Sequence, residues 1–365
     1  MGRAEAALRV LLVLGTSAGG VGRHVRMLAE GLRAEGDQVV VAGPASTDRA
    51  FGFSGLARFA EVPISDRPRP ASDLRAVRRL RALAAGADVV HAHGLRAGAL
   101  AALAPAGRRA GLVVTLHNAL TASGMIGAMY GVLERVVARR ADEVLVVSPD
   151  LGERMAALGA RRVAPAVVPA PPLGPPVRTP AEVRAELGAG EHPILLTIAR
   201  LAQQKGLETL LDAARGPYAG PVPLFAVAGE GPLRGVLQAR IDAEGLPVRL
   251  LGDRADVADL LRAADALVLP SRWEGQPLNV QEALRAGRPI IATAVGGVPG
   301  MVGDAALLVP AGDAAALRRA AEALLADPGL AARLSAAAAA RPLPDRDAAV
   351  RAVRERYGAL RGGRG

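Results

Sequence analysis

The chain has 365 residues, of which 51% are hydrophobic and only 2% aromatic, and its formal net charge is +10. This length exceeds one ordinary hydrophobic core and predicts two domains filled mainly by aliphatic side chains. The absence of cysteine excludes disulfides, thiolate metal sites and a cysteine nucleophile, and it suits a reducing cytoplasm. The apolar run from Leu8 to Leu14 is too short for a signal peptide and is typical of a first strand. Since no apolar run approaches the ~20 residues of a membrane span, we expect a cytoplasmic protein.

The positive charge is concentrated in the first half of the chain. Residues 1–175 hold 22 arginines against 14 acidic residues, whereas residues 176–365 hold 23 basic and 21 acidic residues. Such an excess attracts an anionic membrane surface, an acidic acceptor or nucleic acid. The scarcity of aromatic side chains for base stacking disfavours nucleic acid. Peripheral contact with an anionic membrane stays open, as does an arginine content that only reflects a GC-rich genome.

A glycine-rich turn, Gly15 to Gly22, follows the first predicted strand and precedes helical spacing over residues 23–33. A strand, a glycine turn and a helix start form a common phosphate site, because backbone N–H groups point outward there. Gly19 and Gly20 allow a ligand to approach the backbone closely. The turn does not match the fingerprint G-x-G-x-x-G, which disfavours NAD.

Residues 37–42 predict a second strand, and residues 43–70 an irregular segment. The following helix carries apolar residues on one face and arginines on the other: Leu74, Val77, Leu80 and Leu83 against Arg75, Arg78, Arg79 and Arg81. A basic amphipathic helix can lie on a membrane surface. A solvated face of an ordinary α/β helix is the commoner source of this pattern.

Histidines end two further predicted strands. His91 and His93 end a strand at residues 88–94, and His117 follows a strand at residues 112–116. Ligands in open α/β sheets bind at the carboxyl ends of the strands, so we expect these imidazoles to face a crevice. No spacing supplies three or four convergent metal ligands, and a hydrogen-bonded core histidine is the alternative for each.

The rest of the first half predicts a helix at residues 124–140 and a strand at residues 144–148. The helix has a second basic face, formed by Arg135, Arg139 and Arg140. The proline-rich run at residues 169–176 is the clearest linker in the chain. It predicts domains at residues 1–172 and 173–344, followed by a terminal helical segment at residues 345–365.

The second half repeats the alternation of strands and helices. A strand at residues 194–199 leads into Arg200 and Lys205, the only lysine in a chain with 44 arginines. This exception indicates a position that requires a compact ammonium rather than a planar guanidinium. Gly229 follows a strand at residues 224–228, and Arg254 follows one at residues 248–251.

Two glutamates bracket a loop and a helix start near residue 280. Glu274 and Gly275 follow a strand at residues 266–269. Leu278 and Asn279 precede the predicted helix that contains Glu282. Glu274 therefore falls at the ligand-binding edge of a sheet. The helix macrodipole alone could also favour acidic residues here.

Together these segments resemble the retaining glycosyltransferases of family GT4, which have the GT-B fold and the signature E-x7-E. Glu274 and Glu282 carry that signature here, and residues 271–278 read Ser-Arg-Trp-Glu-Gly-Gln-Pro-Leu, close to a common form of the motif. The resemblance covers nearly the whole chain. It departs at Gly300, where relatives usually have a glutamate after the proline.

The resemblance implies two Rossmann-like domains facing across a cleft, with the terminal helix crossing back to the first. It places the acceptor at the N-terminal domain, near Gly19, Gly20, His91 and His93. It places the donor at the C-terminal domain, with contacts from Gly20, Arg200, Lys205, Gly229, Arg254, Glu274, Gly275, Leu278, Asn279 and Glu282.

Each catalytic assignment also follows from the resemblance. Arg200 and Lys205 would neutralise the departing diphosphate, Glu274 would hold hydroxyls of the transferred sugar, and His117 would touch that sugar. Glu282 would bind the ribose. No metal or cofactor is expected, and the pair Asp345 and Asp347 is better explained as a helix cap than as a metal site.

The function expected is transfer of a hexosyl group from a nucleotide-diphosphate sugar to an acceptor hydroxyl. UDP is the favoured nucleotide and GDP the other candidate, while a lipid-linked or cell-envelope acceptor stays open. A phosphorylase, an epimerase or a non-catalytic sugar-nucleotide binder is the alternative.

Overall fold

The computed structural model describes residues 7–17, 19–104, 110–119 and 124–362. The chain divides into two compact units, which we call the N-terminal unit (residues 1–169 and 344–365) and the C-terminal unit (residues 170–343). The sequence placed the corresponding boundaries after residues 172 and 344. Residue 18, within the predicted glycine-rich turn, lies outside the described residues.

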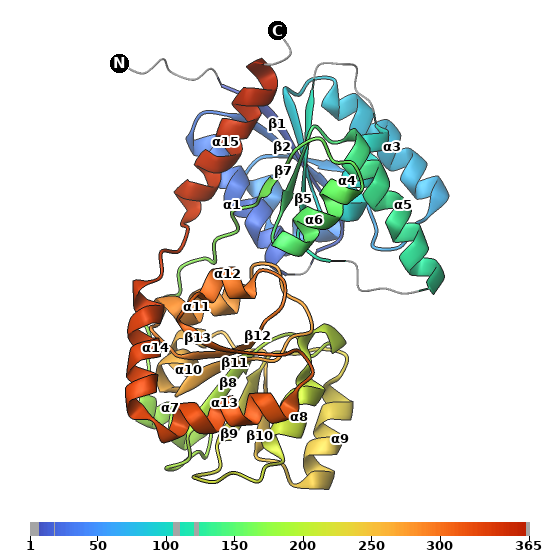
Figure 1. Cartoon of the computed structure of the whole chain (residues 1–365). Coiled ribbons are helices and arrows are strands. Elements are labelled where there is room, and N and C mark those ends of the chain that lie inside the picture. Colours follow the sequence, from blue (N-terminus) through green and yellow to red (C-terminus); the bar gives the residue numbers. More distant parts are fainter. Residues whose placement is uncertain (1–6, 18, 105–109, 120–123, 363–365) are drawn as a thin grey trace. The chain divides into compact units, whose positions relative to one another are not determined.

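The N-terminal unit contains a parallel seven-stranded sheet in the order β3-β2-β1-β4-β5-β6-β7 (Figure 1). Its strands are β1 (Arg9–Leu14), β2 (Gln38–Gly43), β3 (Arg58–Glu61), β4 (Val89–His93), β5 (Gly111–Leu116), β6 (Glu143–Val146) and β7 (Val163–Pro165). The central strands are short apolar runs because helices bury both faces of a parallel sheet. The first strand lies inside the sheet and the order then extends to both sides, as in Rossmann-like folds.

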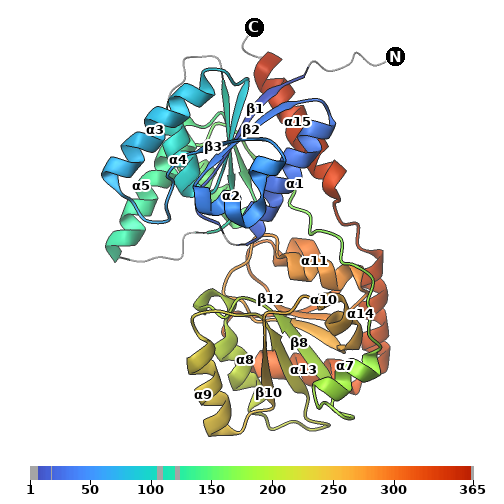
Figure 2. The ribbon, with the colours of Figure 1, turned by 180° about the vertical axis from the view of Figure 1, so that it is seen from behind.

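Helices cover both faces of this sheet. They are α1 (Gly20–Ala34), α2 (Ala45–Phe51), α3 (Pro70–Ala84), α4 (Leu95–Leu103), α5 (Gly124–Arg140), α6 (Pro149–Ala157) and α15 (Arg346–Gly362). α1 and α15 pack on one face, and α3, α4 and α5 lie on the other (Figures 1 and 2). Two glycines permit close packing: a Cβ on Gly31 would lie 2.2 Å from Val350, and one on Gly98 would lie 2.5 Å from Val114.

The expectation of an irregular segment at residues 43–70 is wrong. This segment forms α2, a 3-10 turn at Phe53–Gly55 and the edge strand β3. Tertiary packing explains the order: a Cβ on Gly22 would lie 2.1 Å from the ring of Phe51, so the ring fills the space over the glycine. The rings of Phe51 and Phe53 lie 6.0 Å apart, and those of Phe53 and Phe59 are stacked at 6.4 Å. A seven-residue helix held by such contacts leaves little periodicity in the sequence.

The terminal helix α15 is an integral part of the N-terminal unit. Asp345 caps its start, accepting a hydrogen bond from the Ala348 N–H at 2.7 Å, as expected for a cap. Arg354 forms an ion pair with the buried Asp37 at 3.0 Å. Tyr357 is fully buried.

The C-terminal unit contains a parallel six-stranded sheet in the order β10-β9-β8-β11-β12-β13. Its strands are β8 (Ile194–Ile198), β9 (Leu224–Ala228), β10 (Val248–Gly252), β11 (Ala266–Leu269), β12 (Ile290–Thr293) and β13 (Ala306–Val309). Its helices are α7 (Pro180–Glu186), α8 (Leu207–Ala214), α9 (Arg234–Glu244), α10 (Val257–Ala263), α11 (Leu278–Arg285), α12 (Val298–Val302), α13 (Ala314–Ala326) and α14 (Pro328–Ala340). A 3-10 turn spans Gln203–Lys205.

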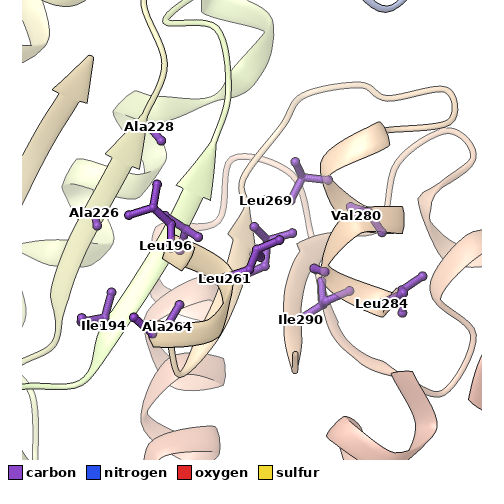
Figure 3. Close-up of a cluster of buried hydrophobic side chains, with 14 of the residues drawn as sticks. Ile194, Leu196, Ala226, Ala228, Leu261, Ala264, Leu269, Val280, Leu284 and Ile290 are labelled. Carbon is purple, nitrogen blue, oxygen red and sulfur yellow. The ribbon is translucent and has the colours of Figure 1, made fainter. Parts of the chain in front are cut away.

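Alternation along these strands divides the core into two layers. Ile194 and Leu196 pack with Val280, Leu284 and residues of α10 on one face (Figure 3). Leu195, between them in sequence, packs with α8, α9 and α13 on the other face. Successive side chains of a strand point to opposite faces, so each strand contributes to both layers. No helix in the described ranges is long and apolar enough to cross a membrane.

Candidate functional site

The structure brings Lys205 and Glu274 together in the C-terminal unit. Lys205 follows β8 and Glu274 follows β11, and these strands are neighbours in the sheet. The Lys205 Nζ lies 2.6 Å from Glu274 Oε1. Ser271 donates its hydroxyl to the same oxygen at 2.7 Å. The glutamate is only 6% exposed, so two donors hold one oxygen of a nearly buried carboxylate.

Three contacts fix the loops that carry this pair. Gly206 has a φ of +61°, and a Cβ there would lie 2.1 Å from the carbonyl oxygen of Pro270. The Arg272 N–H donates to the Gln204 carbonyl at 2.8 Å. The Gln204 side chain in turn donates to the Trp273 carbonyl at 2.9 Å. The loops after β8 and β11 are therefore joined backbone to backbone, which leaves Lys205 little freedom relative to Glu274.

The loop after β12 supports Glu274 from another direction. The Gly297 N–H donates to the Glu274 carbonyl at 3.0 Å. Gly296 has a φ of +52°, and a Cβ there would lie 1.9 Å from that carbonyl oxygen. The Thr293 hydroxyl donates to the carbonyl of Ser271 at 2.6 Å. Only glycine fits at position 296, where the backbone comes this close to the Glu274 carbonyl oxygen.

α11 presents its N-terminus at the same edge of the sheet. It begins at Leu278 and contains Glu282, which is partly buried. The Asn279 side chain donates to the Ile198 carbonyl at the end of β8, at 2.7 Å. It is therefore a tether between α11 and β8. Gly275, in the loop before α11, is buried.

Gly229 lies beside the loop that carries Arg200. Arg200 is exposed just beyond β8. A Cβ on Gly229 would lie 2.0 Å from the carbonyl oxygen of Ala199, and the Gly229 N–H donates to the Gly252 carbonyl at 2.7 Å. The glycine thus permits close contact between the ends of β8 and β9.

Arg254 was predicted to contact the donor, and the structure shows its side chain among carboxylates of the C-terminal unit. Its guanidinium forms ion pairs with Glu186 at 2.7 Å and with Asp256 at 2.6 Å. Glu186 ends α7 and Asp256 precedes α10, and these two helices pack against each other. Arg178 forms further ion pairs there, with Asp256 and Asp259. The Arg254 side chain is therefore part of a structural ion-pair network.

In the N-terminal unit, His91 is a core residue. It is fully buried, its Nδ1 hydrogen-bonds to the Tyr357 hydroxyl, and its Nε2 hydrogen-bonds to the Thr115 hydroxyl at 2.7 Å. Burial lowers its pKa to about 3. The prediction that His91 lines the acceptor pocket is wrong, because both of its nitrogens are already bonded inside the core.

His93 and His117 meet at the carboxyl ends of β4 and β5. The Nδ1 of His93 lies 3.1 Å from the Nε2 of His117, and the rings stack with centroids 5.4 Å apart. His93 is 2% exposed and His117 is partly exposed. Burial lowers the pKa of His93 well below its usual value and that of His117 to about 4.

A fourth histidine, His24, joins this cluster and was not predicted as a site residue. It lies on α1 and is buried, with its ring centroid 5.7 Å from that of His93 and 5.5 Å from that of His117. Burial, assisted by the neighbouring imidazoles, lowers its pKa well below the usual value. A signal existed in the sequence: the chain has five histidines, and this one follows the glycine-rich turn by two residues.

The glycine-rich turn leads into α1, which begins three residues earlier than the helical spacing over residues 23–33 predicted. The helix begins at Gly20, and the Gly22 N–H donates to the Ser17 hydroxyl oxygen at 3.1 Å. A Cβ on Gly19 would meet nothing within 4 Å, so this position faces open space. Across the described part of the chain, no group of three or more histidine, aspartate or glutamate side chains is arranged to hold a metal ion.

Comparison with known proteins decides the family. Residues 180–341 match the sequence profile described as glycosyl transferases group 1, and residues 19–171 match that of a glycosyl transferase 4-like domain. A Mycobacterium leprae protein named phosphatidyl-myo-inositol mannosyltransferase is 32% identical over 344 residues, which is 88% of this chain and 87% of that protein. The chain belongs to the group 1 glycosyltransferases.

This glycosyltransferase has the GT-B fold. The crystal structure of Anabaena HepE in complex with UDP aligns with a TM-score of 0.80, covering 96% of this chain and 100% of that one, at 20% identity. The Streptomyces kanamyceticus alpha-D-kanosaminyltransferase is 31% identical over 224 residues. That alignment spans 58% of each protein, whereas the two profile matches together cover residues 19–171 and 180–341 of the glycosyltransferase.

Proposed function

We propose that this glycosyltransferase transfers a hexosyl group from a nucleotide-diphosphate sugar to an acceptor hydroxyl with retention of the anomeric configuration. The pair formed by Lys205 and Glu274 is the observation that carries the proposal. It combines a cation suited to a diphosphate with a carboxylate suited to sugar hydroxyls, at the carboxyl edge of a parallel sheet.

Lys205 can serve the carboxylate and the diphosphate together. An ammonium has three N–H donors, and the contact with Glu274 uses one. Arg200, exposed beyond the same strand, adds a second positive charge. As the bond between the anomeric carbon and the phosphate oxygen breaks, both cations stabilise the charge that develops on the leaving diphosphate.

Glu274 is oriented to bind the transferred sugar. Lys205 and Ser271 occupy its Oε1, so Oε2 is left to accept from a sugar hydroxyl. In the proposed retaining reaction the acceptor oxygen attacks on the face that the phosphate leaves, and the acceptor proton passes to a phosphate oxygen. Glu282 binds the ribose and the N–H groups at the start of α11 contribute partial positive charge. No metal ion is required by this arrangement.

We favour a UDP-sugar as donor, with a GDP-sugar as the alternative. HepE, crystallised with UDP and with UDP-glucose, supports the first choice through its similar fold. The name of the mycobacterial mannosyltransferase supports a lipid-linked acceptor hydroxyl. A phosphorylase, an epimerase or a sugar-nucleotide binder would lack transfer to such an acceptor.

A thermal-shift screen of UDP, GDP, ADP and their sugar conjugates tests the donor, each with and without EDTA. Binding to the native state raises the melting temperature by mass action. The donor that raises it is then supplied with candidate acceptors, and NMR of the product reports the anomeric configuration. A UDP-sugar shift unaffected by EDTA and a retained configuration are expected. No shift with any nucleotide, or an inverted product, would refute the proposal.

We also propose peripheral contact with an anionic membrane through α3 and α5. The arginines predicted on the two helices are all exposed: Arg75, Arg78, Arg79, Arg81, Arg135, Arg139 and Arg140. Leu74, on the predicted apolar face of α3, is 51% exposed, and Val132 of α5 is 55% exposed. α3 and α5 lie on the same face of the N-terminal sheet, on either side of α4 (Figures 1 and 2). Arginines around exposed apolar side chains are typical of interfacial binding.

A further inference from the structure

The histidine cluster of the N-terminal unit shows a defined order of contacts. His91 and His93 are two residues apart on β4, so both side chains point to the same face of the sheet, towards α1 and α15. Tyr357 of α15 and Thr115 of β5 bind the two nitrogens of His91. The His91 ring lies 4.1 Å from that of His93, which contacts His117. The contacts thus run from the buried Tyr357 and Thr115, through His91 and His93, to the partly exposed ring of His117.

Protonation in this cluster is restricted. Burial lowers the pKa of all four imidazoles, so each is neutral near pH 7 and carries one N–H and one bare nitrogen. Only one hydrogen can lie between His93 Nδ1 and His117 Nε2. Two arrangements are therefore available, in which either His93 or His117 is the donor.

The remaining nitrogen of His93 distinguishes the two arrangements. Its Nε2 is buried and has no hydrogen-bond partner in the described part of the chain. If His117 donated, His93 would carry its hydrogen on Nε2 and leave a buried N–H without an acceptor. If His93 donates from Nδ1, only a bare nitrogen is buried. Orphaned buried N–H groups are rarer than under-satisfied acceptors, which favours His93 as the donor.

We infer that His93 is a positioning residue: by donating from Nδ1 to His117 Nε2, it holds His117 as the Nδ1–H tautomer. His117 then offers a hydrogen-bond donor to a substrate oxygen at the carboxyl edge of the N-terminal sheet. The inference about substrate rests on the proposed function, whereas the tautomer does not. His91, fixed by Tyr357 and Thr115, restricts the ring of His93 and so supports the same geometry.

Nitrogen-15 NMR of histidine-labelled protein tests the tautomer without any substrate. Five histidines give a small spectrum, which single His→Gln variants can assign. We expect His117 with a protonated Nδ1 and a bare Nε2. In His93→Asn the amide N–H can replace the Nδ1–H donor and should preserve this state, whereas His93→Leu should release it. A wild-type His117 protonated on Nε2, or an unchanged tautomer in His93→Leu, would overturn the inference.

Transfer kinetics test the consequence for the reaction. His93→Leu should lower kcat by about 10–100-fold, the range typical of removing a hydrogen-bond partner that orients a metal-binding histidine, and His93→Asn should recover most of that loss. His192→Gln, at an exposed position of the C-terminal unit, is the control. If the tautomer changes in His93→Leu while kcat does not, the positioning role is refuted. If the wild-type protein transfers no sugar from any donor, the proposed function fails, and the NMR result still decides the tautomer.

Discussion

The Nζ of Lys205, the only lysine of the chain, lies 2.6 Å from the Oε1 of Glu274. The side chain of the lysine is 23% exposed and that of the glutamate 7% exposed. The carboxylate is therefore almost removed from water, while the ammonium can still meet a ligand. This asymmetry makes Lys205 both a structural partner of Glu274 and the more accessible member of the pair.

Replacement of Lys205 by alanine should lower kcat by about 100-fold or more, because a cation that stabilises the departing diphosphate is lost. The protein should remain folded, with its free energy of unfolding lowered by about 1–3 kcal/mol, since Glu274 loses a buried hydrogen-bond partner. Transfer assays and urea unfolding measure the two effects. Activity equal to that of the wild-type protein would remove Lys205 from the diphosphate site.

The double variant Lys205→Met with Glu274→Gln separates the two roles. It replaces both charges by neutral side chains of similar size, so much of the lost stability should return. Transfer should not return, because the cation that stabilises the departing diphosphate is still missing. A double variant as active as Lys205→Ala alone but far less stable would show that the charges were not the source of the stability loss.

Gly206→Ala should destabilise the C-terminal unit far more than Gly245→Ala. Both glycines have a φ near +60°, but a Cβ on Gly206 would lie 2.1 Å from the Pro270 carbonyl oxygen, whereas one on Gly245 would meet nothing within 4 Å. Gly245→Ala should therefore cost only the backbone strain of about 1–2 kcal/mol, and Gly206→Ala about 2–5 kcal/mol. Denaturant unfolding compares them. Equal losses would mean that the loops after β8 and β11 are not held together as described.

Glu282→Ala should weaken donor binding by about 10–100-fold, the equivalent of losing hydrogen bonds to a charged group. The value of kcat at saturating donor should change little, because the ribose is remote from the breaking bond. Isothermal titration with the nucleotide that gives a thermal shift measures the affinity. Glu191→Ala, at an exposed position before β8, is the matched control. Unchanged affinity in Glu282→Ala would refute the ribose assignment.

Much of the fold could be predicted because short apolar runs alternate with helical spacing. The strand at residues 266–269 is found at those residues, and the helix at residues 124–140 is found as α5. The segment at residues 43–70 could not be predicted, because contacts between Phe51 and Gly22 order it and local periodicity does not. The alanine-rich segment at residues 313–340 is two helices, since Asp327 caps a new start at Pro328.

Proximity of the predicted site residues could be expected where the motif itself positions the side chains. Residues 271–274 place Ser271 and Glu274 within one loop, and the glycine at 206 brings Lys205 to them. The sequence did not report the position of His24 or the ion pairs of Arg254, because their surroundings come from elements distant in sequence. His24 is buried beside His93 of β4 and His117, which follows β5, and Arg254 is held by Glu186 of α7. Such contacts depend on packing between elements, which local spacing does not report.

The N-terminal unit should lose stability as the pH falls below 6.5. Burial lowers the folded-state pKa of His91 to about 3 and that of His117 to about 4, while the unfolded value is near 6.5. Between these limits the unfolded state binds more protons, so the free energy of unfolding falls with falling pH by up to about 1.4 kcal/mol per pH unit for each histidine. Urea unfolding at intervals from pH 7.5 to 5 measures the slope.

His24→Gln should make that slope shallower, because it removes one buried imidazole whose pKa is lowered by burial. His192→Gln changes an exposed histidine of the C-terminal unit and serves as the control. Carboxylates titrate in both variants, so their contribution to the slope is the same in each and drops out of the comparison. A slope in His24→Gln equal to that of the wild-type protein would contradict the assignment of buried, neutral imidazoles.

The proposed membrane contact predicts a salt-sensitive affinity for anionic vesicles. Arg78→Glu with Arg81→Glu removes two exposed cations from α3, on the side that also carries Leu74. The partition coefficient should fall by roughly 30-fold or more, at about 1 kcal/mol per cation. Arg262→Glu with Arg319→Glu changes the net charge equally on the C-terminal unit and should have a much smaller effect. Co-sedimentation with vesicles at low and high salt measures both variants, and equal losses would mean that net charge, rather than α3, attracts the protein to the membrane.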